Sequence, residues 1–269
     1  MRNSKLKKLR SILLDSGPAL VAFSGGVDST FLLKAAMEAL GREKVLAVIA
    51  RSETYPESEV KSAVKLARKL KARLKVIHTC EINDERFLKN PLKRCYYCKH
   101  ELFSKLKAIA KQEGLSAVFD GANYDDRLDF RPGSIAGKEL GVRSPLKEAQ
   151  ITKAEIRAFS KECKLPTWNK PSLACLASRI PFGTRIEKKT LKQVGTAEDY
   201  IKGLGFKQVR VRHHGSIARI EVFLEDVERL LGLKNKITEK LKALGYTYVT
   251  VDLEGFRSGS MNPVKKGAK

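Results

Sequence analysis

Two cysteines separated by two residues form the part of this chain best suited to metal or redox chemistry. They are Cys95 and Cys98 in the stretch KRCYYCK, where cations flank them on both sides. Neighbouring positive charge lowers the pKa of a thiol and favours the thiolate, the form that binds metals or attacks an electrophile. A zinc site, an iron–sulfur cluster and a dithiol redox pair all remain open from this pattern alone. Even with one more cysteine, a zinc site would be one ligand short unless Cys80, His100 or Cys163 joined it.

A third cysteine, Cys175, lies in the apolar stretch SLACLASR at residues 172–179. Such surroundings suit a core filler, but also a metal ligand or a reacting sulfur, and the local sequence leaves these three uses open. The chain has five cysteines in all, an odd number. With no secretion signal recognised, this argues for thiols in a reducing compartment and against a disulfide framework.

The stretch SGGVDST, residues 24–30, follows an apolar strand and precedes a helical pattern. Its two glycines allow a sharp turn with exposed N–H groups, its hydroxyls add donors, and the helix N-terminus adds partial positive charge. This combination predicts a phosphate-binding loop. The loop lacks the lysine of a Walker motif, and the near match GSIAGKE at residues 133–139 has the wrong spacing and no Ser or Thr for magnesium.

A polar cluster, GANYDDRLDFRPG at residues 121–133, follows a later apolar run. Acidic residues beside a phosphate site can hold Mg²⁺, which prefers oxygen ligands, although a charged loop with Asx turns is the simpler alternative for any one of them. Within this cluster we expect Asp126 to hold the magnesium. The expected nucleotide-binding residues are Ser24, Gly25, Gly26, Val27, Asp28, Ser29, Ser52, Asn123 and Asp126.

Arginines alternate along the strand-like stretch VRVRHH at residues 209–214. Alternation places Arg210, Arg212 and His214 on one face, and a turn at residues 214–215 brings Arg219 and Glu221 beside them. Paired arginines suit bidentate recognition of a phosphate, whereas a solvated strand face with a cross-strand ion pair is the alternative.

Apolar runs at residues 19–23, 44–50, 74–79 and 117–122 alternate with helical patterns. This βαβα alternation predicts an α/β fold with a parallel sheet, whose ligands gather at the carboxyl ends of the strands. Beyond residue 185 the pattern changes to helix, two strands, helices and a final strand, which indicates a smaller α+β unit. We therefore expect one domain at residues 1–184 and a second at 185–269.

The composition is that of a globular protein with a strong positive charge. Among 269 residues, 42% are hydrophobic and 31% charged, so disorder is not expected, and no apolar run is long enough to span a bilayer. The basic N-terminal stretch has the pattern of an amphipathic helix, so we expect a cytoplasmic protein without membrane contact. The net charge of +23 would attract anions. Because the cations are dispersed, a small anionic substrate or simply a lysine-rich surface is favoured over nucleic acid.

The SGGxDS loop resembles that of the PP-loop ATP pyrophosphatase superfamily. The resemblance implies cleavage of ATP between its α- and β-phosphates, with Asp28 helping to hold Mg²⁺ and the loop N–H groups holding pyrophosphate.

Further motifs make the chain similar to the LarE family of ATP-dependent sulfur transferases along nearly its whole length. They are NPLKRCYYCK, NYDDRLDFRPG, NKPSLACLASRIPFGTRI, VRVRHHGSIARIEV and GFRSGSMNP. The resemblance implies adenylation of a carboxylate of a pyridinium dicarboxylate mononucleotide and its conversion to a thiocarboxylate, in the biosynthesis of the nickel-pincer nucleotide. It also implies a hexameric ring. The expected substrate-binding residues are Arg179, Arg210, Arg212, His214, Arg219 and Glu221.

The family uses two sources of sulfur. Some members sacrifice the cysteine that matches Cys175, whereas others carry two extra cysteines and use the replaceable sulfide of a [4Fe–4S] cluster. Because Cys95 and Cys98 are present, we expect the second type, with the cluster on Cys95, Cys98 and Cys175. The catalytic residues would be Cys175 and Asp28.

Three other functions compete with this interpretation. A tRNA thiolase is a PP-loop enzyme that the positive charge would suit, but no aromatic-rich RNA module is apparent. A nucleotide or metal sensor would retain the fold without turnover. An amide-forming ligase would need a glutaminase domain, which is not recognisable here.

Overall fold

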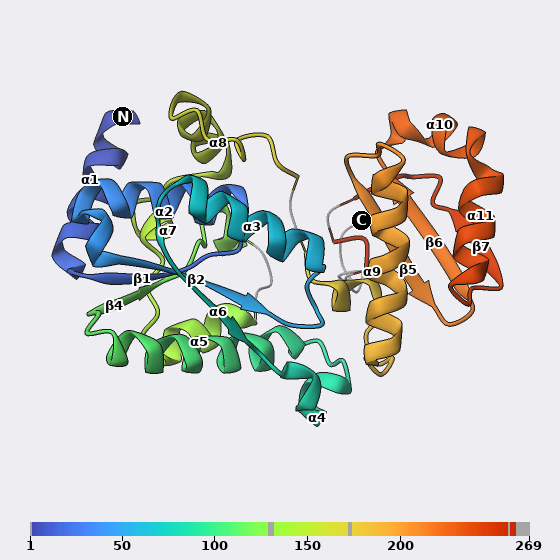
Figure 1. The fold of residues 1–269 in the computed structure, drawn as a ribbon, viewed down its shortest axis with the longest axis horizontal. Helices are drawn as coiled ribbons and strands as arrows, with labels where there is room; N and C mark the ends of the chain where they lie inside the picture. The colour runs from blue at the N-terminus through green and yellow to red at the C-terminus, as the bar shows by residue number, and fades with distance from the viewer. Residues whose placement is uncertain (1, 129–131, 172–173, 258, 262–269) are drawn as a thin grey trace. The chain divides into compact units, whose positions relative to one another are not determined.

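A computed structural model describes residues 2–128, 132–171, 174–257 and 259–261 (Figure 1). The chain divides into two compact units. The first comprises Met1–Phe87 and Pro91–Leu173, and the second comprises Leu88–Asn90 and Ala174–Lys269. Part of the polar cluster predicted at residues 121–133, namely 129–131, lies outside the described residues, as do Ser172 and Leu173 of the SLACLASR stretch.

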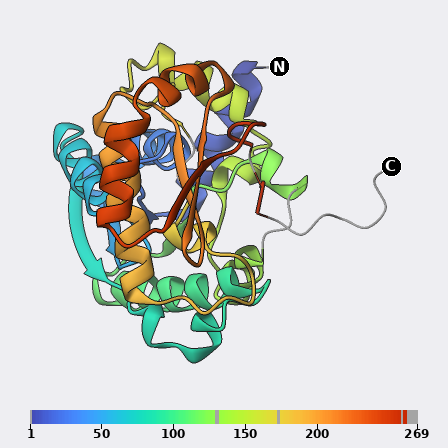
Figure 2. The ribbon, with the colours of Figure 1, turned by 90° about the vertical axis from the view of Figure 1, so that its right-hand side faces the viewer.

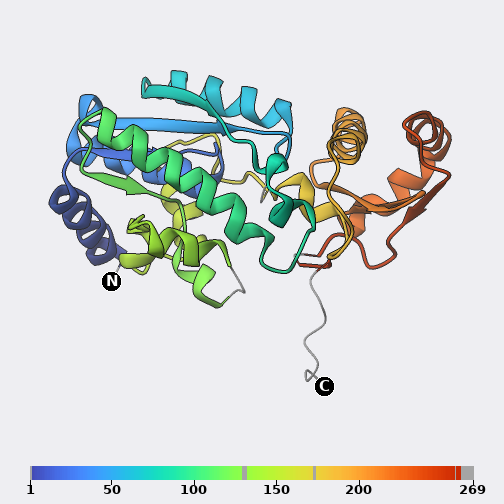
Figure 3. The ribbon, with the colours of Figure 1, turned by 90° about the horizontal axis from the view of Figure 1, so that it is seen from below.

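The first unit is a parallel sheet between two layers of helices (Figures 1 and 3). The strands are β1 (Ala19–Ala22), β2 (Val45–Arg51), β3 (Arg73–His78) and β4 (Ala117–Phe119). The helices are α1 (Arg2–Ser16), α2 (Val27–Leu40), α3 (Glu57–Lys69), α4 (Glu85–Leu88, which ends in the second unit), α5 (Arg94–Gln112), α6 (Gly133–Glu139), α7 (Pro145–Glu148) and α8 (Lys153–Glu162).

The strands lie in the order β3-β2-β1-β4, and every pairing is parallel. Successive residues of a strand face opposite sides, so Ala19 and Val21 pack toward α1, α2, α3, α7 and α8, while Leu20 packs toward α5. Both faces are therefore apolar, as expected of a covered parallel sheet. The polar loops that follow β1 and β4 leave the carboxyl ends of these two neighbouring strands.

Two local features follow the sequence pattern. Gly41 caps the end of α2 with a φ of +89°, a conformation that glycine adopts without strain. Residues 133–139, the stretch that resembles a Walker motif, form helix α6 and no phosphate loop.

The second unit packs helices on a three-stranded sheet (Figure 2). Its elements are α9 (Lys188–Gly203), β5 (Val209–His214), β6 (Ile217–Val222), α10 (Val227–Gly232), α11 (Lys234–Ala243) and β7 (Tyr248–Val251). β5 pairs antiparallel with β6, and β6 pairs parallel with β7. Val209 and Val211 share one core with residues of α9, α10 and α11.

The predicted fold class, a parallel α/β sheet with a smaller α+β unit, is confirmed. No helix within the described ranges combines the length and apolar character needed to cross a membrane.

Candidate active site

The loop between β1 and α2 is held in shape by its own hydroxyl groups. The hydroxyls of Ser24 and Ser29 lie 3.1 Å apart, and the hydroxyl of Thr30 donates to the carbonyl of Gly26 at 2.7 Å. Gly25 has a φ of +68°, and a Cβ there would lie only 2.7 Å from the Cβ of Ala63 on α3. Glycine is thus required at position 25 both by conformation and by packing.

Asp28 lies on the first turn of α2, and only one of its two carboxylate oxygens has a hydrogen-bond partner among the described residues. Its Oδ2 pairs with the ammonium of Lys153, the first residue of α8. Its Oδ1 is buried and has no hydrogen-bond partner among the described residues. A buried, unsatisfied carboxylate oxygen beside a phosphate loop is a suitable ligand for a hard divalent cation. The site therefore fits Mg²⁺.

The loop after β4 lies directly against the start of α2. A Cβ on Gly121 would be 3.1 Å from the amide nitrogen of Ser29. Further along, Asn123 is 4% exposed and its N–H donates to Oδ2 of Asp126 at 2.9 Å. The N–H of Lys153 donates to Asp125 at 2.8 Å, which ties this loop to α8. The structure thus places Asn123 and Asp126 in the loop that borders the predicted phosphate site.

A second lysine reaches the phosphate loop from the NKP segment. The ammonium of Lys170 donates to the carbonyl of Gly25 at 3.1 Å and pairs with Glu59 of α3 at 3.0 Å. It therefore fixes the main chain of the loop. Lys153 and Lys170 supply, from distant segments, the positive charge that the loop itself lacks.

Ser52, at the end of β2, belongs to a different hydrogen-bond network. Its hydroxyl lies 2.8 Å from the hydroxyl of Thr54 and donates to Glu81 at 2.8 Å. Glu81 is 2% exposed, and it also accepts from Thr54 at 2.6 Å and from the Sγ of Cys98 at 3.8 Å. This network connects the end of β2 with the CxxC pair.

The CxxC pair lies at the start of α5, where Cys95 and Cys98 are about one turn of helix apart. Cys95 is exposed and Cys98 is half-buried. A Cβ on Gly133 would lie 3.2 Å from the carbonyl of Cys95, so α6 begins against this turn. Cys175 is half-buried and belongs to the second unit. The five cysteines, all within the described residues, form no disulfide, and no three potential metal ligands in the described part of the chain gather into a metal site.

Arg179 is buried next to the segment that carries Cys175. It is 2% exposed, and its guanidinium pairs with both oxygens of Glu198 at 2.7 and 2.9 Å. The same guanidinium donates to the carbonyls of Ala174 and Cys175 at 2.9 and 3.0 Å. Arg179 therefore holds the main chain on both sides of the Cys175 side chain.

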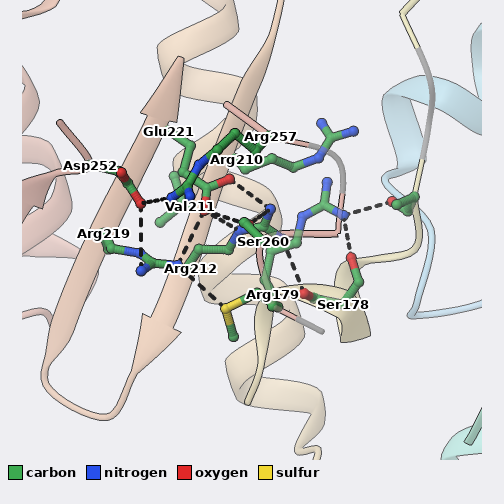
Figure 4. A network of polar contacts seen from close by, with 12 residues as sticks. Ser178, Arg179, Arg210, Val211, Arg212, Arg219, Glu221, Asp252, Arg257 and Ser260 are labelled. Carbon is green, nitrogen blue, oxygen red and sulfur yellow. Dashed lines mark hydrogen bonds and ion pairs between the residues drawn. The ribbon is translucent and has the colours of Figure 1, made fainter. Parts of the chain in front are cut away.

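Arg212 and Arg219 belong to a largely buried polar network around Glu221 (Figure 4). Arg212 is 4% exposed and pairs with Glu221 at 2.9 and 2.6 Å, while it donates to the carbonyl of Ser178 at 3.1 Å. Arg219 also contacts Glu221, at 3.2 Å, and pairs with Asp252 at 3.5 Å. On the expected strand face, Arg210, Arg212 and Glu221 are therefore buried, whereas Arg219 is half-buried and His214 is exposed.

Burial and neighbouring charges set the pKa values in this network. Burial is the main reason that the pKa of Arg210 falls to about 10, and the positive charge of Arg179 adds to it. Burial would raise the pKa of Glu198, but the charge and hydrogen bonds of Arg179 hold it below the ordinary value. His214 is exposed, and its pKa is lowered by partial burial and then by Arg219 and Arg212. Glu198 and Arg210 are thus both charged at neutral pH.

Several charged residues at these sites were not predicted from the sequence, among them Lys153, Lys170, Glu81 and Glu198. Lys170 lies in the NKP motif, so its neighbours carried a signal. The sequence around Lys153 gives a weaker signal, which marks only the start of a helix: Thr152 before it is the N-cap of α8. For Glu81 and Glu198 no local pattern distinguishes them from other glutamates.

A parallel α/β sheet with an SGGxDS loop between its first strand and a helix defines a nucleotide-binding protein of the PP-loop class. A family model described as NAD synthase matches residues 8–92. The chain is 40% identical, over 96% of its length and 94% of the relative, to pyridinium-3,5-bisthiocarboxylic acid mononucleotide synthase of Lactiplantibacillus plantarum. It is also similar to uncharacterised proteins of Synechocystis sp. (41% identity over 98% of this chain and 99% of the relative) and Methanocaldococcus jannaschii (30% over 94% and 98%). The chain belongs to the LarE family, as its motifs predicted.

Proposed function

We propose that this protein is an ATP-dependent sulfur transferase that converts a carboxylate of a pyridinium dicarboxylate mononucleotide to a thiocarboxylate. The observation that carries the proposal is the state of Asp28 at the start of α2, whose Oδ1 has no partner among the described residues and whose Oδ2 pairs with Lys153 of α8. The similarity to the L. plantarum synthase over 96% of the chain supports the choice of substrate.

The first step is adenylation. A carboxylate oxygen of the substrate attacks the α-phosphorus of ATP, the bond to the β-phosphate oxygen breaks, and pyrophosphate leaves. The N–H groups of the loop at residues 24–29 and the start of α2 are suited to bind the departing pyrophosphate, because helix N-termini attract phosphate. Asp28 would hold Mg²⁺, with Asp126 as a further candidate ligand, and the ion would neutralise the developing negative charge.

The second step forms the carbon–sulfur bond. A sulfur nucleophile attacks the acyl carbon, the bond to the AMP oxygen breaks, and AMP leaves with its electron pair. Adenylation makes this displacement favourable because a free carboxylate is a poor acyl electrophile. We propose that Arg179 orients Cys175 for this step, and that Arg210, Arg212, His214, Arg219 and Glu221 form the subsite for the substrate phosphate.

We propose further that Cys95, Cys98 and Cys175 hold a [4Fe–4S] cluster, which would supply the replaceable sulfide. The donor set fits in part: Cys95 and Cys98 are one helical turn apart on one helix, and three thiolates leave one iron open for an exogenous ligand. Iron and acid-labile sulfide in anaerobically purified protein test this proposal, with Cys163→Ser as the control for Cys95→Ser. An iron-free wild-type protein that still transfers sulfur contradicts it.

Pyrophosphate release tests the proposed adenylation. We expect the wild-type protein to release pyrophosphate only when ATP, Mg²⁺ and the pyridinium dicarboxylate mononucleotide are all present. Asp28→Asn should reduce the rate by roughly 100-fold or more, because it removes the ligand of the ion that stabilises the transition state. Asp15→Asn, at an exposed position of α1, is the control and should leave the rate unchanged. Release without the mononucleotide, or none with it, contradicts the proposed substrate.

We also propose a cytoplasmic homo-oligomer, a hexamer by resemblance to the family. Size-exclusion chromatography with light scattering at micromolar protein tests the assembly, and a monomer would contradict it.

A further inference from the structure

Lys153 stands where a helix disfavours a cation. It is the first residue of α8, and the partial positive charge of a helix N-terminus favours anions there. An acidic residue, which is usual in the first turn of a helix, follows two residues later: Glu155 forms a capping box with Thr152. A lysine at this position therefore needs a carboxylate partner to be tolerated, and such exceptions to local preference are common at functional sites.

The surrounding contacts fix the position of Lys153 closely. Its N–H donates to Asp125, and the capping glutamate Glu155 pairs with Lys5 of α1 at 2.8 Å. One face of α8 packs on α2, where Phe31 and Phe159 stack with ring centroids 5.7 Å apart.

Two helix N-termini therefore meet at the Asp28–Lys153 pair. Asp28 precedes Phe31 by one turn of α2, and Lys153 precedes Phe159 on α8, so the two helices run in the same direction. Their partial positive charges add at this point. The pair thus lies in a field that favours phosphate and disfavours an unpaired ammonium.

Asp28 has only one carboxylate to offer to two cations. Lys153 occupies Oδ2, and the buried Oδ1 has no partner among the described residues. A divalent cation bound through Oδ1 would compete with the ammonium for the negative charge of the same group. Lys170 is not in this position, because its partners are Glu59 and the carbonyl of Gly25.

We propose that Lys153 is a movable counter-ion of Asp28. Its ammonium neutralises the carboxylate while no divalent cation is bound, and the cation displaces it onto the phosphates of the incoming nucleotide. The side chain is 32% exposed, so it has room to rotate about its own bonds without movement of α8. The inference rests on the proposed function in that the nucleotide is magnesium–ATP, but it concerns binding alone.

Removing the ammonium should change two affinities in opposite directions. In Lys153→Met, Mn²⁺ without nucleotide should bind about three- to tenfold more tightly than in wild type, because its competitor for Asp28 is gone. ATP in the presence of Mg²⁺ should bind about tenfold or more weakly, because a charge-assisted hydrogen bond to phosphate is lost. Free Mn²⁺ is measured by its electron paramagnetic resonance signal, and ATP binding by isothermal calorimetry.

Three variants separate this role from a structural one. Lys153→Gln should behave as Lys153→Met does, and Lys153→Arg, which keeps the charge, should retain near wild-type affinity for Mn²⁺. Lys147→Met, at an exposed position of α7, should change neither affinity. Unchanged or weaker Mn²⁺ binding in both neutral variants, or unchanged ATP binding, overturns the proposal. Neither measurement uses the mononucleotide or sulfur, so failure of sulfur transfer would be recognised separately.

Discussion

Arg179 makes five hydrogen bonds, two of which hold main-chain carbonyls beside the Cys175 side chain. Besides Glu198 and the two carbonyls, it donates to the hydroxyl of Ser178 at 2.8 Å. Because the guanidinium is 2% exposed and these bonds use all of its nitrogens, its charge serves to position the segment and does not reach solvent. A buried ion pair of this kind is costly to break from one side only.

Replacing Glu198 by Gln should therefore destabilise the protein strongly. The unpaired Arg179 charge would remain buried, with an expected loss of about 3–5 kcal/mol in the free energy of unfolding at neutral pH. Urea unfolding followed by circular dichroism measures this, with Glu225→Gln, an exposed glutamate, as the control. A loss no larger than that of the control would contradict the role of the pair.

The lowered pKa of Glu198 also predicts how the stability difference between wild type and Glu198→Gln depends on pH. Its pKa in the folded protein lies below the ordinary value of 4.5, so its stabilisation is complete above about that pH. As the pH falls through the folded pKa, the carboxyl takes up a proton and the stabilisation is lost. The difference between wild type and Glu198→Gln should be constant from neutral pH to about pH 5 and shrink below it. An equal difference in acid and at neutral pH would contradict the assignment.

At the scale of residues, sequence reasoning found the loop but not its partners. The types and spacing in SGGVDST were enough, because strand, turn and helix are contiguous there. Lys153 could not be found in that way, since it is 125 residues from Asp28 and meets it only through the packing of α8 on α2. The same holds for Glu81, which meets Cys98 only in the folded first unit.

The packing of α3 against the phosphate loop is the contact that shapes the nucleotide site. Ala63 of α3 lies where a side chain at position 25 would be, and Lys170 joins α3 to the loop through Glu59. Contacts within the protein thus hold the main chain of the loop.

Gly25→Ala should destabilise the protein, whereas Gly26→Ala should not. The first places a Cβ 2.7 Å from that of Ala63 at a φ of +68°, and we expect a loss of about 1–3 kcal/mol. The second has a φ of −81° and only the Ser24 hydroxyl at 3.4 Å, so its effect should be about 1 kcal/mol or less. Thermal and urea unfolding without nucleotide measure both.

A double variant distinguishes the two causes of the predicted loss. Ala63→Gly in the Gly25→Ala background should recover only the loss due to the Ala63 Cβ, because the new Cβ also lies 2.9 Å from the Cα of residue 63, and it should leave the part due to the backbone conformation. Equal stability of Gly25→Ala and Gly26→Ala would contradict the packing argument.

At the scale of elements, periodicity located the four parallel strands within a few residues. Apolar runs bounded by helical patterns carry that information directly. The order β3-β2-β1-β4 was not predicted, because it depends on which faces the crossover helices cover. Strand β4 is shorter than its apolar run, since its pairing with β1 ends at Phe119 and the N–H of Asp120 donates to the carbonyl of Arg143 at 2.9 Å.

The whole molecule combines a nucleotide-binding unit with a unit rich in buried arginine. The first contains the phosphate loop, Asp28 and the CxxC pair, and the second contains Cys175 and the arginine network. The net charge of +23 fits the proposed binding of ATP and a phosphorylated substrate.

The central claim is that this protein transfers sulfur repeatedly to an adenylated carboxylate. The most direct test is the number of thiocarboxylates formed per protein chain, counted by mass spectrometry of the mononucleotide after anaerobic incubation with ATP, Mg²⁺ and sulfide. We predict that the ratio rises well above one while Cys175 remains cysteine. No thiocarboxylate would contradict sulfur transfer, and a ratio that stops at one with Cys175 converted to dehydroalanine would contradict the cluster as its source.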